Sequence, residues 1–169
     1  MGLDHIFYLS IGSNLGHRLQ YIKNGLRDLK TLPTNITSIS SVYETSAIGM
    51  VDAPHFLNIC VCGKTQLDAS IFISKLLEIE IKNGRTRTEG NTSSRTLDLD
   101  IIFFDQLIIN TPQLQIPHPR YKERKFVLLP LLEINPIIQD PVEMKPVSDF
   151  LRSSNDNSSL KKLDINLFT

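Results

Sequence analysis

A run of alternating residues near the middle of the chain, RTLDLDIIFF at 95–104, restricts the folds open to this sequence more than any other segment. Apolar and polar residues alternate there with a period of two, which is typical of a strand that has one buried face. Asp98 and Asp100 are therefore predicted to project from one face, with their backbones about 6.6 Å apart. The apolar side chains of the other face are Leu97, Leu99, Ile101 and Phe103.

Two carboxylates at this spacing repel each other unless a cation lies between them. Oxygen ligands suit a hard divalent ion, and Mg²⁺ favours one or two carboxylates together with phosphate oxygens. Basic side chains occur around the pair, at Arg85, Arg87, Arg95, His118, Arg120 and Arg124. Carboxylates for a metal beside guanidinium groups for phosphate predict phosphoryl-type transfer. The alternative is an exposed strand face that carries two solvated acids.

Composition narrows the class of protein. A chain of 169 residues, 41% of them apolar and 21% charged, is expected to form a globular domain with a hydrophobic core. Its 18 basic and 18 acidic residues balance, which disfavours bulk binding of nucleic acid. No apolar run is long enough to span a membrane and the start of the chain lacks a signal-peptide pattern, so we expect a cytoplasmic protein. Cys60 and Cys62 are expected to be buried thiols in a reducing compartment.

Helical and strand patterns alternate along the first 104 residues. Strands are predicted at 5–11, 35–45, 56–65 and 95–104, and helices at 18–32 and 69–82, the second with Asp68 as its N-cap. This β-α-β-β-α-β order predicts a ferredoxin-like α+β fold, in which helices pack on an antiparallel sheet. Beyond it we expect an extended segment at 116–120, a helix at 126–134 and a short amphipathic turn at 147–151.

Three segments are predicted to be irregular. Residues 83–94 (NGRTRTEGNTSS) contain two glycines and no apolar residue, which is typical of a mobile loop that closes over a site. Gly12-Ser13-Asn14 is expected to be a tight strand-to-helix turn in which the asparagine acts as a cap. Residues 153–159 (SSNDNSS) are expected to fray. The prediction is one domain over 1–152 followed by a polar tail over 153–169.

Several motifs together resemble the 6-hydroxymethyl-7,8-dihydropterin pyrophosphokinase family of folate biosynthesis. They are GSNLG at 12–16, YETSAIG at 43–49, FLN at 56–58, IEIKNGRTR at 79–87, RTLDLDI at 95–101, IPHPR at 116–120 and ERKFVLLPLLEINP at 123–136. RTLDLDI followed at this distance by PHPR is highly specific. The resemblance implies a monomeric ferredoxin-like enzyme that transfers a pyrophosphoryl group from ATP to the pterin hydroxymethyl group and leaves AMP. Its partners would be small molecules, with neither nucleic acid nor membrane.

The resemblance also implies roles for individual residues. Those implied in catalysis are Arg85, Arg95, Asp98 and Asp100, with the two aspartates as ligands of two Mg²⁺ ions. Those implied in binding ATP are Glu80, Arg87, Ile101, His118 and Arg124. Those implied in the pterin pocket are Thr45, Ile48, Phe56, Asn58 and Phe126, with the two phenyl rings on opposite faces of the pterin.

The loop before Arg95 departs from the family pattern. Many members carry a tryptophan there in a WGPR-like context, whereas this chain reads TSSR at 92–95 and contains no tryptophan. Leu77 replaces a frequent glutamine, and Thr88 and Glu89 follow Arg87. We expect a weaker seal over the pterin as a result. Two alternatives stay open: an RNA-recognition module, which the balanced charge and the lack of RNP-like aromatic strings disfavour, and an inactive relative that only binds nucleotide.

Overall fold

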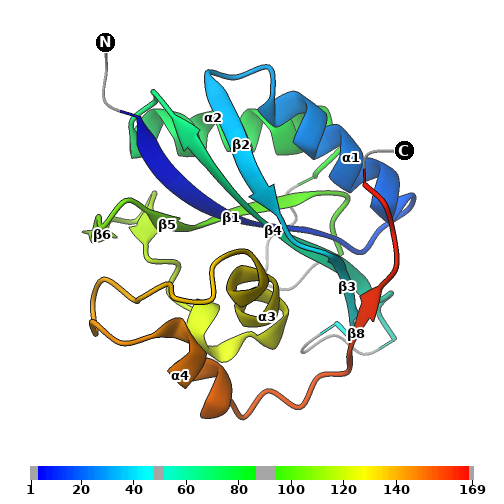
Figure 1. Cartoon of the computed structure of the whole chain (residues 1–169). Helices are drawn as coiled ribbons and strands as arrows, with labels where there is room; N and C mark the ends of the chain where they lie inside the picture. The colour runs from blue at the N-terminus through cyan, green and yellow to red at the C-terminus, as the bar shows by residue number, and fades with distance from the viewer. Residues whose placement is uncertain (1–3, 48–51, 87–93, 168–169) are drawn as a thin grey trace.

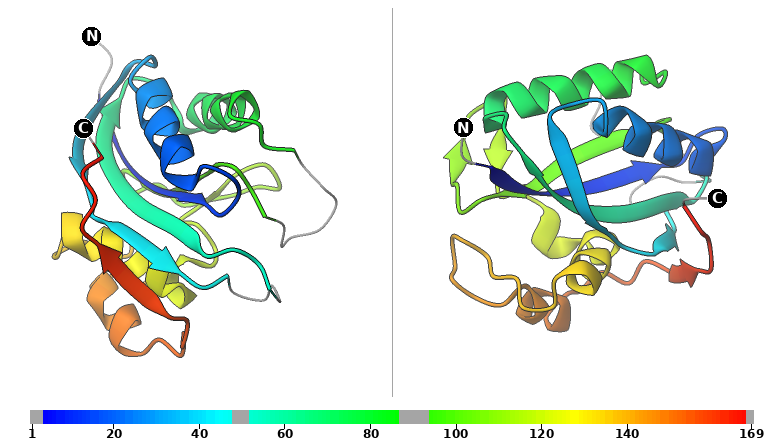
Figure 2. Two further views of the ribbon diagram at one scale, coloured as in Figure 1. Left: turned by 90° about the vertical axis from the view of Figure 1, so that its right-hand side faces the viewer. Right: turned by 45° about the horizontal axis from the view of Figure 1, so that its top comes forward.

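The computed structural model describes residues 4–47, 52–86 and 94–167. The elements form three layers, with the central sheet between two layers of helices (Figure 1). Helices α1 (Arg18–Leu29) and α2 (Ala69–Lys82) cover one face, and helices α3 (Lys125–Ile134) and α4 (Val147–Arg152) lie against the other, as both views in Figure 2 show.

The central sheet has six strands in the order β5-β1-β4-β3-β8, and β2 pairs with β4 beside β3. Every pairing is antiparallel. The strands are β1 (His5–Ser13), β2 (Thr34–Ile39), β3 (Val42–Thr45), β4 (Phe56–Thr65), β5 (Asp98–Phe104) and β8 (Leu160–Leu163). The order is β1-α1-β2-β3-β4-α2-β5, and β2 and β3 both pair with β4. With β2 and β3 counted as one interrupted strand, this is the β-α-β-β-α-β arrangement, so the predicted ferredoxin-like α+β fold is confirmed.

A short irregular stretch connects β5 to α3. It contains the two-stranded sheet of β6 (Ile109–Asn110) and β7 (Gln115–Ile116), followed by the 3₁₀ helix η1 (Tyr121–Glu123). The segment that holds His118 lies along β5, because the His118 N–H donates to the Ile102 carbonyl at 3.1 Å. Tyr121 is fully buried, and its hydroxyl donates to the carboxylate of buried Asp140 at 2.5 Å. These contacts hold the PHPR motif against the sheet.

Each face of the sheet has its own hydrophobic core. The core under α1 and α2 contains Phe7, Leu9, Ile11, Ile22, Ile59, Phe72, Leu76 and Leu99, among others. The core under α3 and α4 contains Cys60, Ile102, Phe103, Tyr121, Val127, Leu128 and Leu131, among others. Both cysteines are free, but only Cys60 is buried, so the prediction of two buried thiols is wrong for the partly exposed Cys62.

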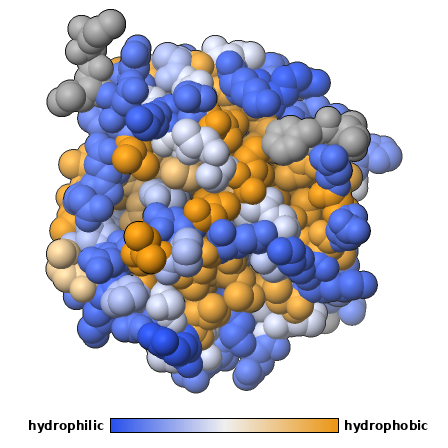
Figure 3. Space-filling model, in the orientation of Figure 1, coloured by the Kyte–Doolittle hydropathy of each residue, from blue (hydrophilic) through white to orange (hydrophobic). Residues whose placement is uncertain are grey.

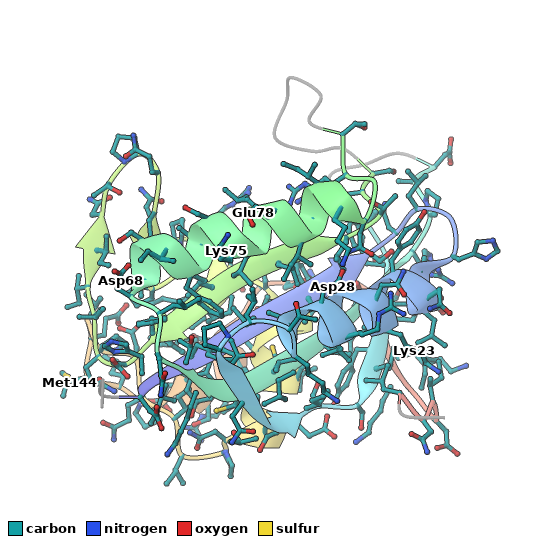
Figure 4. The ribbon with its side chains drawn as sticks, turned by 90° about the horizontal axis from the view of Figure 1, so that it is seen from above. Lys23, Asp28, Asp68, Lys75, Glu78 and Met144 are labelled. Carbon is teal, nitrogen blue, oxygen red and sulfur yellow. The ribbon has the colours of Figure 1, made fainter. Side chains whose placement is uncertain are left out.

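Helices α1 and α2 lie next to each other above the sheet (Figure 4). Asp28 of α1 lies between them, and its carboxylate accepts from Lys82 Nζ at 2.7 Å and from Asn83 Nδ2 at 3.1 Å. The predicted cap of α2 is confirmed, because Asp68 accepts from the Ile71 N–H at 2.9 Å. The end of α2 is thereby fixed where the chain leaves for the predicted loop, whose residues 87–93 lie outside the described residues.

The strand predicted over 35–45 is wrong, because β2 and β3 are separate strands. Between them the Ser40 N–H donates to the Cys60 carbonyl, and the Ser40 hydroxyl accepts from the Cys60 N–H at 2.9 Å. A hydroxyl thus takes the place of a backbone carbonyl, and the chain bends. The helix predicted over 18–32 ends at Leu29, where a turn leads into β2, and Gly12 and Ser13 belong to β1 rather than to a turn.

The alternation predicted for 95–104 holds only for part of the strand. The register between β1 and β5 shifts between Tyr8 and Leu9, which leaves Ile102 as an extra residue in β5. Ile102 and Phe103 therefore both pack under α3, and the prediction that Phe103 shares a face with Leu99 is wrong. The hydrogen-bonded strand also begins at Asp98 rather than at residue 95.

Residues 153–159 do not fray as predicted, because the Ser159 carbonyl accepts from the Ser46 N–H at 3.2 Å and Asp156 also has a partner. Leu160–Leu163 forms β8, an edge strand paired with β3, and Lys125 donates its N–H to Asp156 at 2.9 Å. Whether a domain boundary falls at residue 152 stays a prediction. No helix within the three described ranges is both long and apolar enough to cross a bilayer. Polar and apolar residues are interspersed on the face shown in Figure 3.

Candidate active site

The register of three strands aligns the key residues in a row across the sheet. Gly12 of β1 pairs with Asp98 of β5 on one side and with Asn58 of β4 on the other. Two residues along, Ser10 pairs with Asp100 and with Cys60. Because Cys60 packs under α3, the alternation places both aspartates and Asn58 on that same face. The backbones of Asn58 and Asp98 are two strand spacings, about 10 Å, apart.

Gly12, at the centre of this row, makes room for the neighbouring asparagine. A Cβ atom at position 12 would lie 2.9 Å from Asn58 Oδ1, closer than real Cβ contacts. Asn58 is 2% exposed and donates from Nδ2 to Thr45 Oγ1 at 2.8 Å. The amide therefore has one fixed orientation, with its oxygen directed toward the glycine.

The Asp98 carboxylate lies between two guanidinium groups. Arg85 Nη1 is 2.7 Å from Asp98 Oδ1, and Arg95 Nη1 is 2.7 Å from Asp98 Oδ2. Three of the four residues implied in catalysis thus form one charged cluster. Both arginines are about one-fifth exposed at the side chain (21%), so an anion that approaches from solvent can reach their guanidinium groups.

Glu80 contacts this cluster from the side of the sheet that α2 covers. Its side chain is 2% exposed, accepts from the Leu99 N–H at 2.7 Å and pairs with Arg85 at 2.5 Å. Burial and the nearby charge of Asp98 raise the pKa of Glu80 to about 7. The carboxyl group joins α2 to the open edge of β5 and orients Arg85, while its implied contact with ATP stays a prediction.

Asp100 faces a second pair of nitrogen groups. Its Oδ2 is 3.7 Å from His118 Nε2 and 3.9 Å from Arg124 Nη1. Burial and the charge of Asp98 raise the pKa of Asp100 to about 7, although 34% of its side chain is exposed. Asp100 therefore gains a proton at a higher pH than a solvated aspartate does.

His118 is a neutral hydrogen-bond donor in this environment. Burial and the charges of Arg124 and Arg120 lower its pKa to about 4. Its Nδ1 accepts from the Arg120 N–H at 3.1 Å, so the proton of the neutral ring is on Nε2, the nitrogen that faces Asp100. The structure thus brings His118 and Arg124 to the aspartate pair, as the sequence predicted.

The residues predicted for the pterin pocket lie on two parts of the fold, which would form the two walls of such a pocket. Thr45 of β3 and Phe56 and Asn58 of β4 form one wall, since Thr45 pairs with Phe56 and is bonded to Asn58. Phe126 of α3 belongs to the other, and the Arg124 guanidinium lies 5.5 Å from its ring centre. Ile48 and Arg87 lie outside the described residues, and the side chain of Ile101 is buried in the core under α1 and α2.

Sequence reasoning missed Asn14, which it assigned to a simple helix cap. Asn14 is fully buried, accepts from the Arg95 N–H at 2.8 Å and donates from its own N–H to the Arg95 carbonyl at 3.1 Å. Its Nδ2 donates to Ser94 Oγ and to the Pro54 carbonyl. Asn14 therefore fixes the backbone of Arg95, one of the residues that the family resemblance implies in catalysis. In the sequence, Asn14 comes directly after an apolar strand, and this position could have predicted its role. Burying an amide there without a hydrogen-bond partner would cost free energy.

A family model described as 7,8-dihydro-6-hydroxymethylpterin-pyrophosphokinase (HPPK) matches residues 8–136. The chain belongs to this family. The 2-amino-4-hydroxy-6-hydroxymethyldihydropteridine pyrophosphokinase of Bacillus subtilis is 41% identical over 133 residues, which cover 78% of this chain and 79% of the relative. The enzyme of the same name from Aquifex aeolicus is 35% identical over 143 residues, which cover 85% of this chain and 88% of the relative.

A solved structure confirms that the fold is that of the pyrophosphokinase family. The HPPK-DHPS of Plasmodium falciparum, crystallised with pterin and p-hydroxybenzoate, aligns with a TM-score of 0.70 at 14% identity. The alignment covers 89% of this chain and 42% of the solved chain, so the present chain spans about two fifths of that protein. At this identity the likeness shows the fold alone.

The donor set at the HPPK aspartate pair suits Mg²⁺ only together with a substrate. In the described parts of the chain, no group of three or more His, Cys, Asp and Glu side chains could hold a metal. Asp98 and Asp100 supply two carboxylates, and Mg²⁺ commonly takes one or two carboxylates, substrate phosphates and water. The residues therefore fit a metal that arrives with a polyphosphate.

Proposed function

We propose that this chain transfers a pyrophosphoryl group from ATP to the hydroxymethyl group of 6-hydroxymethyl-7,8-dihydropterin, giving AMP and the pterin diphosphate in folate biosynthesis. The observation that carries the proposal is the cross-strand row from Asn58 through Gly12 to Asp98. The buried Asn58 amide lies about two strand spacings from the aspartate–arginine cluster, which supports a pterin pocket beside that amide. A flat heterocycle in the pocket would direct its hydroxymethyl group toward that cluster.

The reaction requires the hydroxymethyl oxygen to attack the β-phosphorus in line with the departing AMP. Catalysis of such a step depends on positioning and on neutralising charge. In this proposal Phe56 and Phe126 stack on the two faces of the pterin, and Asn58 and Thr45 bind its polar edge. Two Mg²⁺ ions held by Asp98 and Asp100 would neutralise the polyphosphate and polarise the transferred group.

The arginines would change partners when MgATP binds. Both oxygens of Asp98 are bonded to Arg85 and Arg95, so a metal can reach this carboxylate only if a guanidinium moves away. Phosphate oxygens offer an arginine the same charge and the same geometry of acceptors. Each guanidinium thus exchanges a carboxylate for a phosphate, and neither is left unpaired in a partly buried site.

Neutral His118 and charged Arg124 would bind ATP from the other side of the aspartate pair. The Nε2 proton of His118 can be donated to a phosphate or ribose oxygen without adding charge. We further propose that the enzyme acts as a cytoplasmic monomer on small molecules, without nucleic acid. No charge excess attracts a polyanion, since the formal net charge is zero.

The test is an assay for AMP formed from ATP in the presence and absence of the hydroxymethyl-dihydropterin. We expect AMP and pterin diphosphate in equal amounts, and neither without Mg²⁺. ADP as the product would overturn the proposal in favour of an ordinary kinase. Nucleotide binding without any pterin-dependent product would favour the inactive relative, and Asp98→Ala serves as the matched inactive control.

A further inference from the structure

The chain continues for more than 30 residues beyond the segment that matches the family model, which ends at residue 136. Within this continuation, residues 156–163 contact both walls of the proposed pterin pocket. We propose that this segment, which we term the C-terminal strap, is a positioning element that sets the affinity of the enzyme for the pterin. The inference rests on the proposed function, because it concerns the same pocket.

The strap holds the α3 wall through Asp156. Asp156 Oδ2 accepts from the Lys125 N–H at 2.9 Å, at the first residue of α3. The first N–H groups of a helix have no partner inside it, and the N-cap residue Arg124 makes no side-chain cap bond here. Asp156 supplies the missing acceptor and a favourable negative charge. Lys125 lies between Arg124 and Phe126, so this bond fixes the part of α3 that faces the pocket.

Asp156 is itself held in place by its neighbours. The Ser158 N–H donates to Asp156 Oδ1 at 2.8 Å, and the Asp156 N–H donates to Ser154 Oγ at 3.1 Å. Partial burial raises the pKa of Asp156, but the hydrogen bonds from Ser158 and Lys125 outweigh it and leave the pKa below its usual value. The carboxylate is therefore charged at neutral pH and held in a single orientation.

The strap holds the β3 wall through backbone pairing. Leu160 pairs with Thr45, and the Ser46 N–H donates to the Ser159 carbonyl at 3.2 Å. Thr45 is the residue whose hydroxyl accepts from the Asn58 amide. Without β8 the four residues of β3 would form the edge of the sheet and could move away from β4 at the pocket end.

The two walls belong to different layers, and the strap joins them within fewer than ten residues. In Figure 2 the red strand β8 forms the edge of the sheet, next to β3. A flat ligand held between two walls binds best when their spacing is set beforehand. Loosening the strap should therefore weaken the pterin more than ATP, because among the described residues implied in binding ATP only Arg124 adjoins the strap, whereas Glu80 lies on α2 and His118 on the PHPR segment.

Strand geometry supplies a matched pair of variants on the β3 side. Ser46 and Ser159 form a hydrogen-bonded pair, so alternation directs the Lys161 N–H toward β3 and the Lys162 N–H away from it. Lys161→Pro removes a bond to β3, whereas Lys162→Pro places the same ring at the open edge, where proline is tolerated. Lys162 also pairs with Glu133 at 3.0 Å, so Lys162→Ala isolates the loss of that exposed ion pair.

On the α3 side, Asp156→Ala removes the acceptor, and Asp164→Ala removes the same charge from an exposed position nearby. We expect Lys161→Pro and Asp156→Ala each to raise the pterin KM about tenfold, the effect of one hydrogen bond. The ATP KM should stay within about twofold of the wild type, and the three control variants should change neither constant. Circular dichroism and thermal melting verify that each variant is folded.

The inference is overturned if folded Asp156→Ala and Lys161→Pro keep a normal pterin KM. It is also overturned if the two KM values rise together, since a general loosening of the fold would do that. If Lys161→Pro does not fold, Asp156→Ala decides alone. A wild-type chain that forms no AMP with the pterin would instead defeat the proposed function, and wild-type turnover is therefore measured first.

Discussion

Replacing Gly12 with alanine adds a single methyl group at the centre of the row that joins the proposed pterin pocket to the metal site. The new Cβ atom would lie 2.9 Å from Asn58 Oδ1, while its next contacts, at 3.7 and 3.8 Å, are ordinary. The φ angle of Gly12 lies outside the left-handed region, so alanine adds no backbone strain there. The whole effect should therefore be a displacement of the Asn58 amide by several tenths of an ångström.

The size of the effect follows from the burial of Asn58. At 2% exposure the amide cannot turn to solvent, and its bond to Thr45 Oγ1 fixes the other end. A buried polar group that loses its partner costs about 1–3 kcal/mol. If the displaced amide no longer meets the pterin, the affinity for pterin should fall by between about 5-fold and about 150-fold. The contacts proposed for ATP do not involve Asn58 and should be preserved.

The assay is steady-state kinetics with each substrate varied in turn, supported by calorimetric titration of the pterin. Gly25→Ala is the matched control, because the nearest atoms to its new methyl group in α1 are the two Cδ atoms of buried Leu97, at 3.1 and 3.3 Å, and not those of Asn58. That control should leave both KM values unchanged and can add up to about 1 kcal/mol of helix stability. A Gly12→Ala enzyme whose pterin KM is within about twofold of the wild type would refute the reasoning, as would an equal rise in both KM values.

Three further predictions concern the charged cluster. Asp98→Ala at saturating Mg²⁺ should lower AMP formation by about 10²-fold or more, the scale of one preorganised electrostatic group, and near-normal turnover would contradict the role of this carboxylate. The ring-nitrogen NMR shifts of His118 should keep the values of a neutral imidazole from about pH 5.5 to about pH 8, with only a small change as nearby Asp100 titrates, because burial and Arg124 keep the pKa of His118 at about 4; shifts of a protonated ring at about pH 5.5 would be incompatible with a neutral donor. Glu80 has a folded pKa of about 7 against an ordinary 4.5, so its contribution to stability is present below the ordinary value and lost as the pH rises through about 7. Chemical denaturation should therefore show a smaller decline in stability between about pH 5 and about pH 8 for Glu80→Gln than for the wild type, and equal declines would exclude Glu80 as the source.

Much of the fold and part of the candidate site follow from local patterns. The period of two places Asp98 and Asp100 on one face, because successive side chains of a strand alternate whatever it pairs with. Helix α2 and its Asp68 cap likewise depend only on residues within one turn of each other. The order of strands and helices predicted the ferredoxin-like arrangement, since short connections allow few ways to bury the apolar faces.

The failures have a common cause, which is contact between residues far apart in the chain. The break at Ser40 depends on Cys60, and the bulge at Ile102 depends on the register of β5 with β1. Neither partner is visible in the local sequence around the residue that it affects. A polar side chain in an apparently regular strand is therefore ambiguous until the neighbouring strand is known.

The sequence by itself predicted which side chains would carry the chemistry and determined which strand presents the two carboxylates, because residue type and periodicity are local properties. Only the tertiary structure decided that Asn14 fixes Arg95, that Glu80 orients Arg85, and that a polar C-terminal segment becomes a strand beside β3. Each of these depends on a hydrogen bond or ion pair whose two partners meet only after the chain has folded. A buried polar atom gains stability from a partner at close range, and the folded backbone alone establishes which atoms come within that range.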